Sequence, residues 1–313
     1  MEPSLKPLER FAASLLIWLA RAWSLVPVPL ARRVGVAAGR VADMFPNRER
    51  AVADANIAAC FPGLDPGERE DFRKRVLSES GAMFAEMPAA WFRSLRFWEA
   101  RVEAAGFDEH VESLLAQGRG LIVAAPHLGN WEIARVMLNR VVPVTAMYRP
   151  PRQPVLEPLL MQGRERDGAR LVPATASGVR AVHGVLRRGG CIGILPDQAP
   201  KMSDGRAAGV FAPFFGLPAY TMTLVPRLAH RTGAPVLFMI AERQSKGRFR
   251  LRWLDAPPGI DAEDPVVAAT ALNAGVEACV RMSPDQYLWT YKRFAPVPKG
   301  TPSLYMRKRK ARR

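Results

Sequence analysis

One short segment of this chain joins an apolar run to a helix-like pattern through a turn. The apolar run at residues 121–125 follows two closely spaced glycines, a pattern typical of a short buried strand. It continues directly into Pro-His-Leu-Gly-Asn-Trp-Glu at residues 126–132. Gly129 permits a sharp bend, and Asn130 suits the N-cap of a new helix. The segment therefore predicts a strand, a turn and a helix that present polar side chains at a sheet edge.

Two residues of this segment suit acid–base chemistry. His127 and Glu132 are five residues apart, so on one continuous helix they would lie roughly 140° apart. They can meet only if His127 lies in the turn and Glu132 in the first turn of the helix. A carboxylate that orients a histidine fixes its tautomer and makes the ring a general base toward a hydroxyl. We therefore predict a catalytic pair in which Glu132 orients His127; the alternative is a structural histidine at a strand end.

From about residue 101 onward, strand-like and helix-like segments alternate. The candidate strands are 120–125, 142–147, 191–195, 235–241 and 248–253, and the candidate helices are 107–117, 130–140, 154–167, 177–188, 218–232 and 264–281. This alternation is typical of an α/β fold, and we expect a mixed sheet flanked by helices. The segment from Pro196 to Pro218 lacks periodicity and is expected to be a loop beside the active site.

The first hundred residues are expected to be helical. Helices are predicted at 31–44, 48–60 and 67–97, with prolines and glycines marking the turn between the last two. The chain is accordingly divided into a membrane-attachment helix at 1–30, a helical extension at 31–100, an α/β domain at 101–300 and a basic tail at 301–313.

The N-terminal helix decides how we expect the chain to meet a membrane. Residues 11–30 are strongly apolar, but Arg21 interrupts them, and the longest charge-free run is shorter than the roughly 20 residues of a spanning helix. On a helical projection Lys6, Arg10 and Arg21 share one narrow stripe with two serines, and large apolar residues cover the rest. This predicts a helix lying in the plane of an anionic membrane surface. A short spanning anchor and a helix packed on the protein's own core are the alternatives.

The formal charge of +16 narrows the choice of partners. Six of the last seven residues are basic, which leaves +10 spread over the rest of the chain. Such an excess fits nucleic acid, an anionic membrane surface or phosphorylated substrates. No recognition helix, RNP-like strand or zinc finger accompanies the charge, so we expect no nucleic-acid partner.

The sequence carries few signals for a metal or a cofactor. Cys60, Cys191 and Cys279 share no metal-ligand spacing, and the four histidines form no cluster with them, so no metal site is expected. Such a widely spaced, odd set fits a reducing compartment, with each cysteine a small buried residue. The chain lacks GxxxxGK[ST] and GxGxxG, so no nucleotide cofactor is expected, and it lacks the GxSxG of many serine hydrolases.

The segment at residues 127–132 resembles the late acyltransferases of lipid A biosynthesis, which belong to the lysophospholipid acyltransferase superfamily. A lone His-x4-Glu is a weak signal, but seven further blocks follow the family's order over nearly the whole chain. These blocks are residues 56–62, 148–150, 164–168, 195–198, 214–216, 232–236 and 287–294. The departures are Gln153 and Glu157, where the family often has Asn and Asp, and Tyr291, where it has a late histidine.

The resemblance implies a glycerolipid acyltransferase-like fold without a cofactor. It implies transfer of a lauroyl or myristoyl chain from acyl carrier protein to a hydroxyl of a Kdo-lipid IVA type lipid A precursor, at the cytoplasmic face of the inner membrane. His127 would take the proton of the attacking hydroxyl, with Glu132 orienting its ring. No serine or cysteine stands in an activated-nucleophile motif, so direct transfer without an acyl-enzyme is expected. The same chemistry on another glycolipid or an amino-acid lipid, or a non-catalytic membrane-surface module, are the alternatives.

Several polar residues are candidate substrate ligands. Arg149 follows the strand at 142–147, and its planar guanidinium suits the phosphates of the implied acceptor. We expect only one of Arg164 and Arg166 to touch substrate, since a salt-bridged surface is the alternative for both. Asp197 and Gln198 end another strand and are expected to bind the sugar, to hold Arg149 or to support the fold.

Other residues are weaker candidates. Phe214 and Phe215 are expected either to line an acyl channel or to fill the core, and Lys292 or Arg293 to meet phosphate. The first amides of the helix near Asn130 are candidate donors to the oxyanion of a tetrahedral intermediate.

Overall fold

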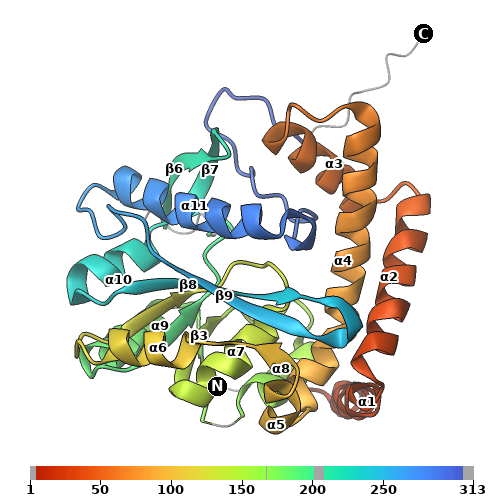
Figure 1. Ribbon diagram of the computed structural model, residues 1–313, viewed down its shortest axis with the longest axis horizontal. Helices are drawn as coiled ribbons and strands as arrows, with labels where there is room; N and C mark the ends of the chain where they lie inside the picture. Colours follow the sequence, from red (N-terminus) through yellow and green to blue (C-terminus); the bar gives the residue numbers. More distant parts are fainter. Residues whose placement is uncertain (1–4, 167, 201–207, 306–313) are drawn as a thin grey trace.

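The computed structural model describes residues 5–166, 168–200 and 208–305 (Figure 1). A seven-stranded sheet forms its centre, in the order β1-β9-β8-β2-β5-β3-β4. Its strands are β1 (Val102–Glu103), β2 (Leu121–Ala124), β3 (Val144–Tyr148), β4 (Arg170–Pro173), β5 (Cys191–Ile194), β8 (Val236–Arg243) and β9 (Phe249–Asp255). The β8–β9 pair is antiparallel and the other pairs are parallel, so the predicted mixed α/β sheet is confirmed.

The central strand β2 shows why these segments fold as they do. All four of its residues are buried, between β5 on one side and β8 on the other. Because side chains alternate along a strand, Leu121 and Val123 pack in one apolar cluster and Ile122 and Ala124 in another. Helices cover both faces, which is why the strands are continuous apolar runs rather than alternating ones.

The helices of the α/β region lie near their predicted positions. They are α6 (Phe107–Leu115), α7 (Trp131–Val141), η1 (Pro154–Leu156) with α8 (Glu157–Arg164), α9 (Ala176–Arg187), α10 (Leu224–Thr232) and α11 (Pro265–Met282). α6 and α7 contribute Val111, Ile133 and Met137 to one cluster, whereas α9, α10 and α11 contribute to the other. The short η2 (Ser245–Gly247) and η3 (Pro284–Gln286) connect later elements.

The predicted loop from Pro196 to Pro218 is in part wrong. Its end forms a separate antiparallel hairpin of β6 (Gly209–Phe214) and β7 (Leu217–Met222), so α10 begins later than predicted. The hairpin turns at Phe215 and Gly216, both at positive φ. Its prolines hide the strand pattern in the sequence because proline is rare inside strands. Residues 201–207 of the predicted loop lie outside the described residues.

The N-terminal third is helical as predicted. Its helices are α1 (Pro7–Ser24), α2 (Val28–Met44), α3 (Arg48–Cys60), α4 (Pro66–Phe92) and α5 (Leu95–Glu99). α2 lies directly against α4, where a Cβ on Gly35 would lie 2.3 Å from the carbonyl oxygen of Gly81. Small residues at this crossing therefore let the two backbones touch. The predicted helix 67–97 is divided because Ser94 caps a new helix.

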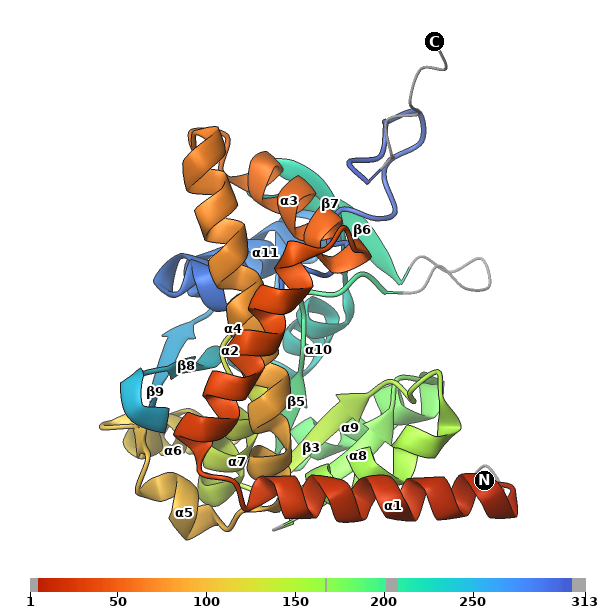
Figure 2. The same ribbon diagram turned by 90° about the vertical axis from the view of Figure 1, so that its right-hand side faces the viewer.

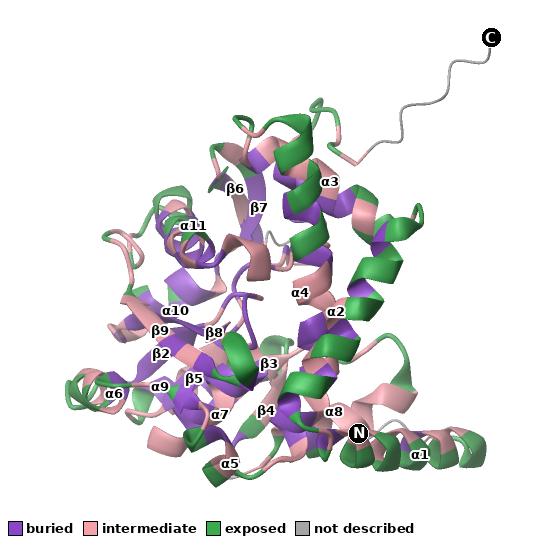
Figure 3. Cartoon of the chain, turned by 45° about the vertical axis from the view of Figure 1, so that its right-hand side comes forward, coloured by how far each residue is buried: buried purple, intermediate pink, exposed green. Residues whose placement is uncertain are grey.

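α1 and α2 lie on one face of the molecule, almost at right angles to each other (Figure 2). No described helix is by itself long and apolar enough to cross a membrane, although α1 and α2, bent by 116°, meet that measure as a pair. α1 contacts α4 and α8 with one side and exposes large apolar residues on another (Figure 3). Most of the predicted basic tail, residues 306–313, lies outside the described residues.

Candidate active site

The predicted strand, turn and helix are all present. His127 lies in the turn between β2 and α7, and Asn130 caps α7 by accepting a hydrogen bond from the Ile133 amide. Gly129 has φ of +62°, and a Cβ there would lie 2.2 Å from the carbonyl oxygen of Ala241. Only glycine suits this position, since it combines a left-handed backbone with a close approach to β8.

The partner of the His127 ring is Asp197, at the end of the neighbouring strand β5. Nδ1 of His127 lies 2.8 Å from Oδ1 of Asp197, and the His127 amide donates to Oδ2 at 3.0 Å. An ionised carboxylate only accepts hydrogen bonds, so Nδ1 carries the proton. Nε2 then has a free lone pair, which faces the side-chain amide nitrogen of Gln198 at 3.2 Å. These two contacts suit the tautomer in which Nε2 can accept a proton.

Asp197 is buried and bound from two sides. Burial raises the pKa of Asp197, but the interactions with His127 lower it by more. The pKa of Asp197 therefore lies below its usual value. The hydroxyl of Tyr287 interacts with the same carboxylate and is itself buried, which raises the pKa of Tyr287 well above its ordinary range. Tyr287, Asp197 and His127 therefore form a chain of polar contacts that fixes the ring.

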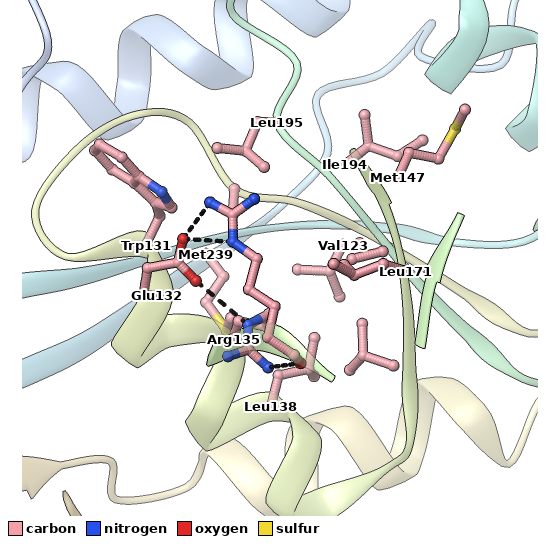
Figure 4. A pocket seen from close by; sticks show the side chains of 15 residues that line it. Val123, Trp131, Glu132, Arg135, Leu138, Met147, Leu171, Ile194, Leu195 and Met239 are labelled. Atoms are coloured by element: carbon pink, nitrogen blue, oxygen red, sulfur yellow. Dashed lines mark hydrogen bonds and ion pairs between the residues drawn. The ribbon is translucent and has the colours of Figure 1, made fainter. Parts of the chain in front are cut away.

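Glu132 does not orient His127, and that prediction is wrong. Oε1 of Glu132 accepts from Nε of Arg164 at 2.8 Å, and Oε2 lies 3.5 Å from Nε of Arg135 (Figure 4). The left-handed bend at Gly129 separates the two residues. His127 lies against Asp197 at the end of β5, whereas Glu132 is buried in the first turn of α7. Burial raises the pKa of Glu132, but the two guanidinium groups lower it below its usual value. A catalytic part for Glu132 stays a prediction.

An apolar pocket lies between α7 and the sheet, next to this ion pair (Figure 4). Its walls come from β2, β3, β5 and α7, with Glu132 and Arg164 at one side. Trp131 lines the pocket and also contacts His127, their ring centroids being 4.9 Å apart. Trp131 therefore connects the pocket to the His127 ring.

The other predicted ligands divide into two groups. Arg164 pairs with Glu132, and Arg166 donates to the Trp91 carbonyl oxygen at 2.5 Å, so both are bound within the protein. Asp197 and Gln198 hold His127 rather than Arg149. Arg149 is exposed after β3, and its charge acts on Tyr291, whose hydroxyl accepts from the Ala199 amide. Of the three arginines, only Arg149 is exposed near His127.

Three of the weaker candidates, Phe214, Phe215 and Arg293, have structural contacts. Phe214 is buried in the core and Phe215 packs on Trp289, so neither lines the pocket beside His127. Arg293 is buried against Thr221 and Asn273, away from solvent. The prediction that Arg293 meets phosphate is therefore wrong.

Comparison with known proteins identifies the family. The family model "Bacterial lipid A biosynthesis acyltransferase" matches residues 1–295. The chain belongs to this family. It is 29% identical over 290 residues to the lipid A biosynthesis lauroyltransferase of Escherichia coli (strain K12), covering 90% of this chain and 92% of the relative. It is 28% identical over 295 residues to the palmitoleoyltransferase of that organism, covering 93% and 92%, and 28% identical over 290 residues to its myristoyltransferase, covering 90% and 84%.

Membership confirms the resemblance that the sequence blocks indicated. The protein is a lipid A biosynthesis acyltransferase, which decides against a non-catalytic binding module. Sequence reasoning missed the contact of Asp197 with His127 and the part played by Tyr287. Both residues belong to blocks that the resemblance had singled out, so the signal was present but not the pairing.

Proposed function

We propose that the acyltransferase moves a fatty acyl chain of the lauroyl or myristoyl class from acyl carrier protein to a hydroxyl of a Kdo-lipid IVA type precursor. The observation that carries this proposal is the His127 ring, whose Nδ1 contacts Asp197, whose Nε2 faces Gln198, and which packs on Trp131 of the apolar pocket. The named activities of the relatives support the acyl class and the acceptor.

The reaction needs no covalent intermediate on the protein. The acceptor hydroxyl displaces the Gln198 amide from Nε2, and its oxygen attacks the thioester carbonyl carbon as Nε2 takes the proton. The carbon–sulfur bond then breaks, and the proton passes to the departing thiolate. Asp197 stabilises the imidazolium between the two steps. The three cysteines are buried, and burial raises each thiol pKa, which supports direct transfer.

The apolar pocket suits the acyl chain of the donor. Its walls are mostly apolar, as is usual for the sites of small molecules. The Asn130 side chain accepts a hydrogen bond from the Ile133 amide. The two preceding amides of α7, at Trp131 and Glu132, have no acceptor within the described residues. They are the candidate donors to the oxyanion, at the junction of the pocket and His127.

The acceptor is the less constrained substrate. Arg149 is exposed at the sheet edge near His127, and we infer that it binds a phosphate of the precursor. The alternative is the same chemistry on another glycolipid or an amino-acid lipid. Mass spectrometry of lipid A from cells lacking the gene distinguishes them: loss of one secondary acyl chain supports the proposal, and unchanged lipid A contradicts it.

The purified enzyme gives the direct test of the base. With acyl carrier protein donor and Kdo-lipid IVA, His127→Ala is expected to lower kcat by about 10²- to 10⁴-fold while the protein stays folded. Arg149→Ala is expected to raise the KM for that acceptor more than for its dephosphorylated form, with Arg149→Lys rescuing only in part. Near wild-type turnover of His127→Ala contradicts the mechanism.

We also propose monotopic attachment to the cytoplasmic face of the inner membrane through α1 and α2. Eleven of the fifteen exposed large apolar residues in the described part of the chain lie between residues 8 and 45. On α1 they include Phe11 and Trp18, and on α2 Val41 and Met44. Basic residues flank the apolar row on each helix, Arg10 and Arg21 on α1, Arg33 and Arg40 on α2. Apolar rows edged by basic residues suit an anionic lipid surface.

A further inference from the structure

The turn that carries His127 is held by backbone hydrogen bonds to two segments distant in the sequence. The His127 carbonyl oxygen accepts from the Leu288 amide at 2.9 Å, and the Gly129 amide donates to the Gln286 carbonyl oxygen at 3.1 Å. The Asn130 amide donates to the Ala241 carbonyl oxygen at 2.9 Å. The turn has no regular secondary structure of its own, so these outside partners set where the imidazole lies.

Two buried charged side chains complete this set of contacts. Arg243, at the end of β8, donates from Nη2 to the Gly129 carbonyl oxygen at 2.8 Å and from Nε to Glu86 at 2.8 Å. The same carboxylate oxygen of Glu86 accepts from the side-chain amide of Asn130 at 3.2 Å. Glu86 is fully buried in α4, and the Arg243 side chain is 2% exposed. The pair thus hydrogen-bonds to both Gly129 and Asn130.

The other partners of this pair do not reach the turn. Arg32 of α2 lies 2.6 Å from the second oxygen of Glu86 and donates to the Gln244 carbonyl oxygen. Glu79 lies about two helical turns before Glu86 on α4. Its carboxylate is 3.4 Å from Nη1 of Arg243 and is partly exposed. Arg32 and Glu79 balance the charge of the pair. Of these four charged residues, Glu86 and Arg243 are the two that contact the turn.

We propose that Glu86 and Arg243 are positioning residues for the reaction, which hold the turn so that His127 meets both Asp197 and the acceptor hydroxyl. A buried ion pair is a poor source of stability, because desolvation offsets most of its attraction. It does provide geometry: the planar guanidinium bonds a carboxylate and a carbonyl in fixed directions. The inference rests on the proposed catalytic part of His127.

The test compares three conservative variants. Arg243→Lys keeps the charge opposite Glu86 but loses the fork, and Glu86→Gln keeps the shape but loses the charge. Each is expected to lower kcat by about 10- to 100-fold at an unchanged KM, since a small misplacement of a catalytic group costs that much. Glu79→Gln makes the same change as Glu86→Gln to the carboxylate that does not touch the turn, and its kcat is expected to stay within about twofold of wild type.

A structural role gives a different pattern. It lowers the melting temperature of the variants but leaves kcat intact in the folded protein, which circular dichroism verifies at the assay temperature. If Glu86→Gln fails to fold, Arg243→Lys still decides, because its buried charges stay balanced. A folded Arg243→Lys enzyme with wild-type kcat overturns the proposal.

A second measurement needs no substrate. The proton that His127 Nδ1 shares with Asp197 is expected to give a low-field NMR resonance, assigned by its loss in His127→Ala. Arg243→Lys should shift or broaden it and Glu79→Gln should not; an unchanged resonance in Arg243→Lys contradicts the proposal. A wild-type enzyme that shows this resonance but does not turn over contradicts the proposed substrates and not the positioning.

Discussion

His127 and Asp197 are 70 residues apart in the sequence, yet the imidazole Nδ1 and the carboxylate Oδ1 lie 2.8 Å from each other. The contact exists because β2 and β5 are parallel neighbours, so the segments that follow them leave the sheet at the same edge. The same carboxylate also accepts the His127 backbone amide, which ties ring and main chain to one anchor.

Replacing Asp197 by Asn is expected to lower kcat by about 10²- to 10⁴-fold with little change in KM, because an amide no longer stabilises the imidazolium. The measurement is steady-state transfer from acyl carrier protein at saturating acceptor. The matched comparison is Glu132→Gln, whose carboxylate does not contact the ring. A larger kcat loss in Glu132→Gln than in Asp197→Asn would return Glu132 to the part that its spacing predicted.

Glu132 should instead govern stability toward acid. Its pKa is lowered in the folded protein, mainly by Arg164 and Arg135 acting against burial, so its contribution is full above its unfolded pKa of about 4.3. That contribution is lost as the pH falls through the lowered folded value. Glu132→Gln is therefore expected to reduce the free energy of unfolding by about 3–5 kcal/mol at neutral pH, since two guanidinium groups lose the negative charge between them.

Urea unfolding at neutral pH and near pH 3 measures this difference. The gap between Glu132→Gln and wild type should narrow in acid. Glu112→Gln, at an exposed site on α6, is the control and should leave the free energy of unfolding nearly unchanged. A gap that is the same at both pH values would mean that the ionised form of Glu132 is not what stabilises the fold.

Residues within the segment around His127 predict its strand, its bend and its helix cap. They do not predict which distant residues the segment contacts in the fold. The β2 strand, the bend at Gly129 and the cap at Asn130 each follow from residues within one short segment. The pairing of His127 with Asp197 depends on strand order, which no local pattern encodes. The spacing of His127 and Glu132 across the bend predicts a pair, but spacing within one segment carries no information on the strand that lies beside it.

The same limit applies elsewhere in the fold. Glu86 lies in the last third of α4 and looks in the sequence like an ordinary helical carboxylate, since its partners come from α2, β8 and the turn. The β6–β7 hairpin was missed because Pro213 and Pro218 break the alternation that marks a strand. Tertiary neighbours decide both cases.

Gly129 provides a test of the bend itself. Gly129→Ala combines a positive φ with a Cβ that would lie 2.2 Å from a backbone oxygen of β8, so the turn must move. Activity is expected to fall by about 100-fold or more, since His127 moves with the turn. Gly118→Ala has a similar φ of +71° but open space around the Cβ, and it should cost only about 1–2 kcal/mol of stability with kcat retained. Equal kcat values for the two variants would contradict a turn held by close packing.

The apolar pocket predicts a change in donor preference. Ala146 lines it from β3, and Ala146→Leu fills part of its volume. The variant is expected to favour shorter acyl chains in a competition among acyl carrier proteins of graded chain length, whereas Ala146→Gly should not. An unchanged chain-length profile in Ala146→Leu would mean that the acyl chain binds elsewhere.

The membrane proposal depends on the exposed basic residues of α1. Attraction to anionic lipid contributes roughly 1 kcal/mol per basic residue near the surface, so replacing Arg10 and Arg21 by Gln should weaken binding to anionic vesicles by about tenfold or more. Binding to zwitterionic vesicles should change little, because only the apolar rows act there. The control replaces Arg187 and Arg231, exposed on α9 and α10 across the sheet from α1 (Figure 1), and should leave both vesicle types unaffected. Co-sedimentation measures all three proteins.

A spanning helix predicts the opposite in membranes: removal of Arg21, the one charge within the apolar stretch of α1, would favour insertion. If the Arg10/Arg21 variant resists alkaline carbonate extraction better than wild type does, α1 crosses the bilayer and the monotopic proposal is wrong.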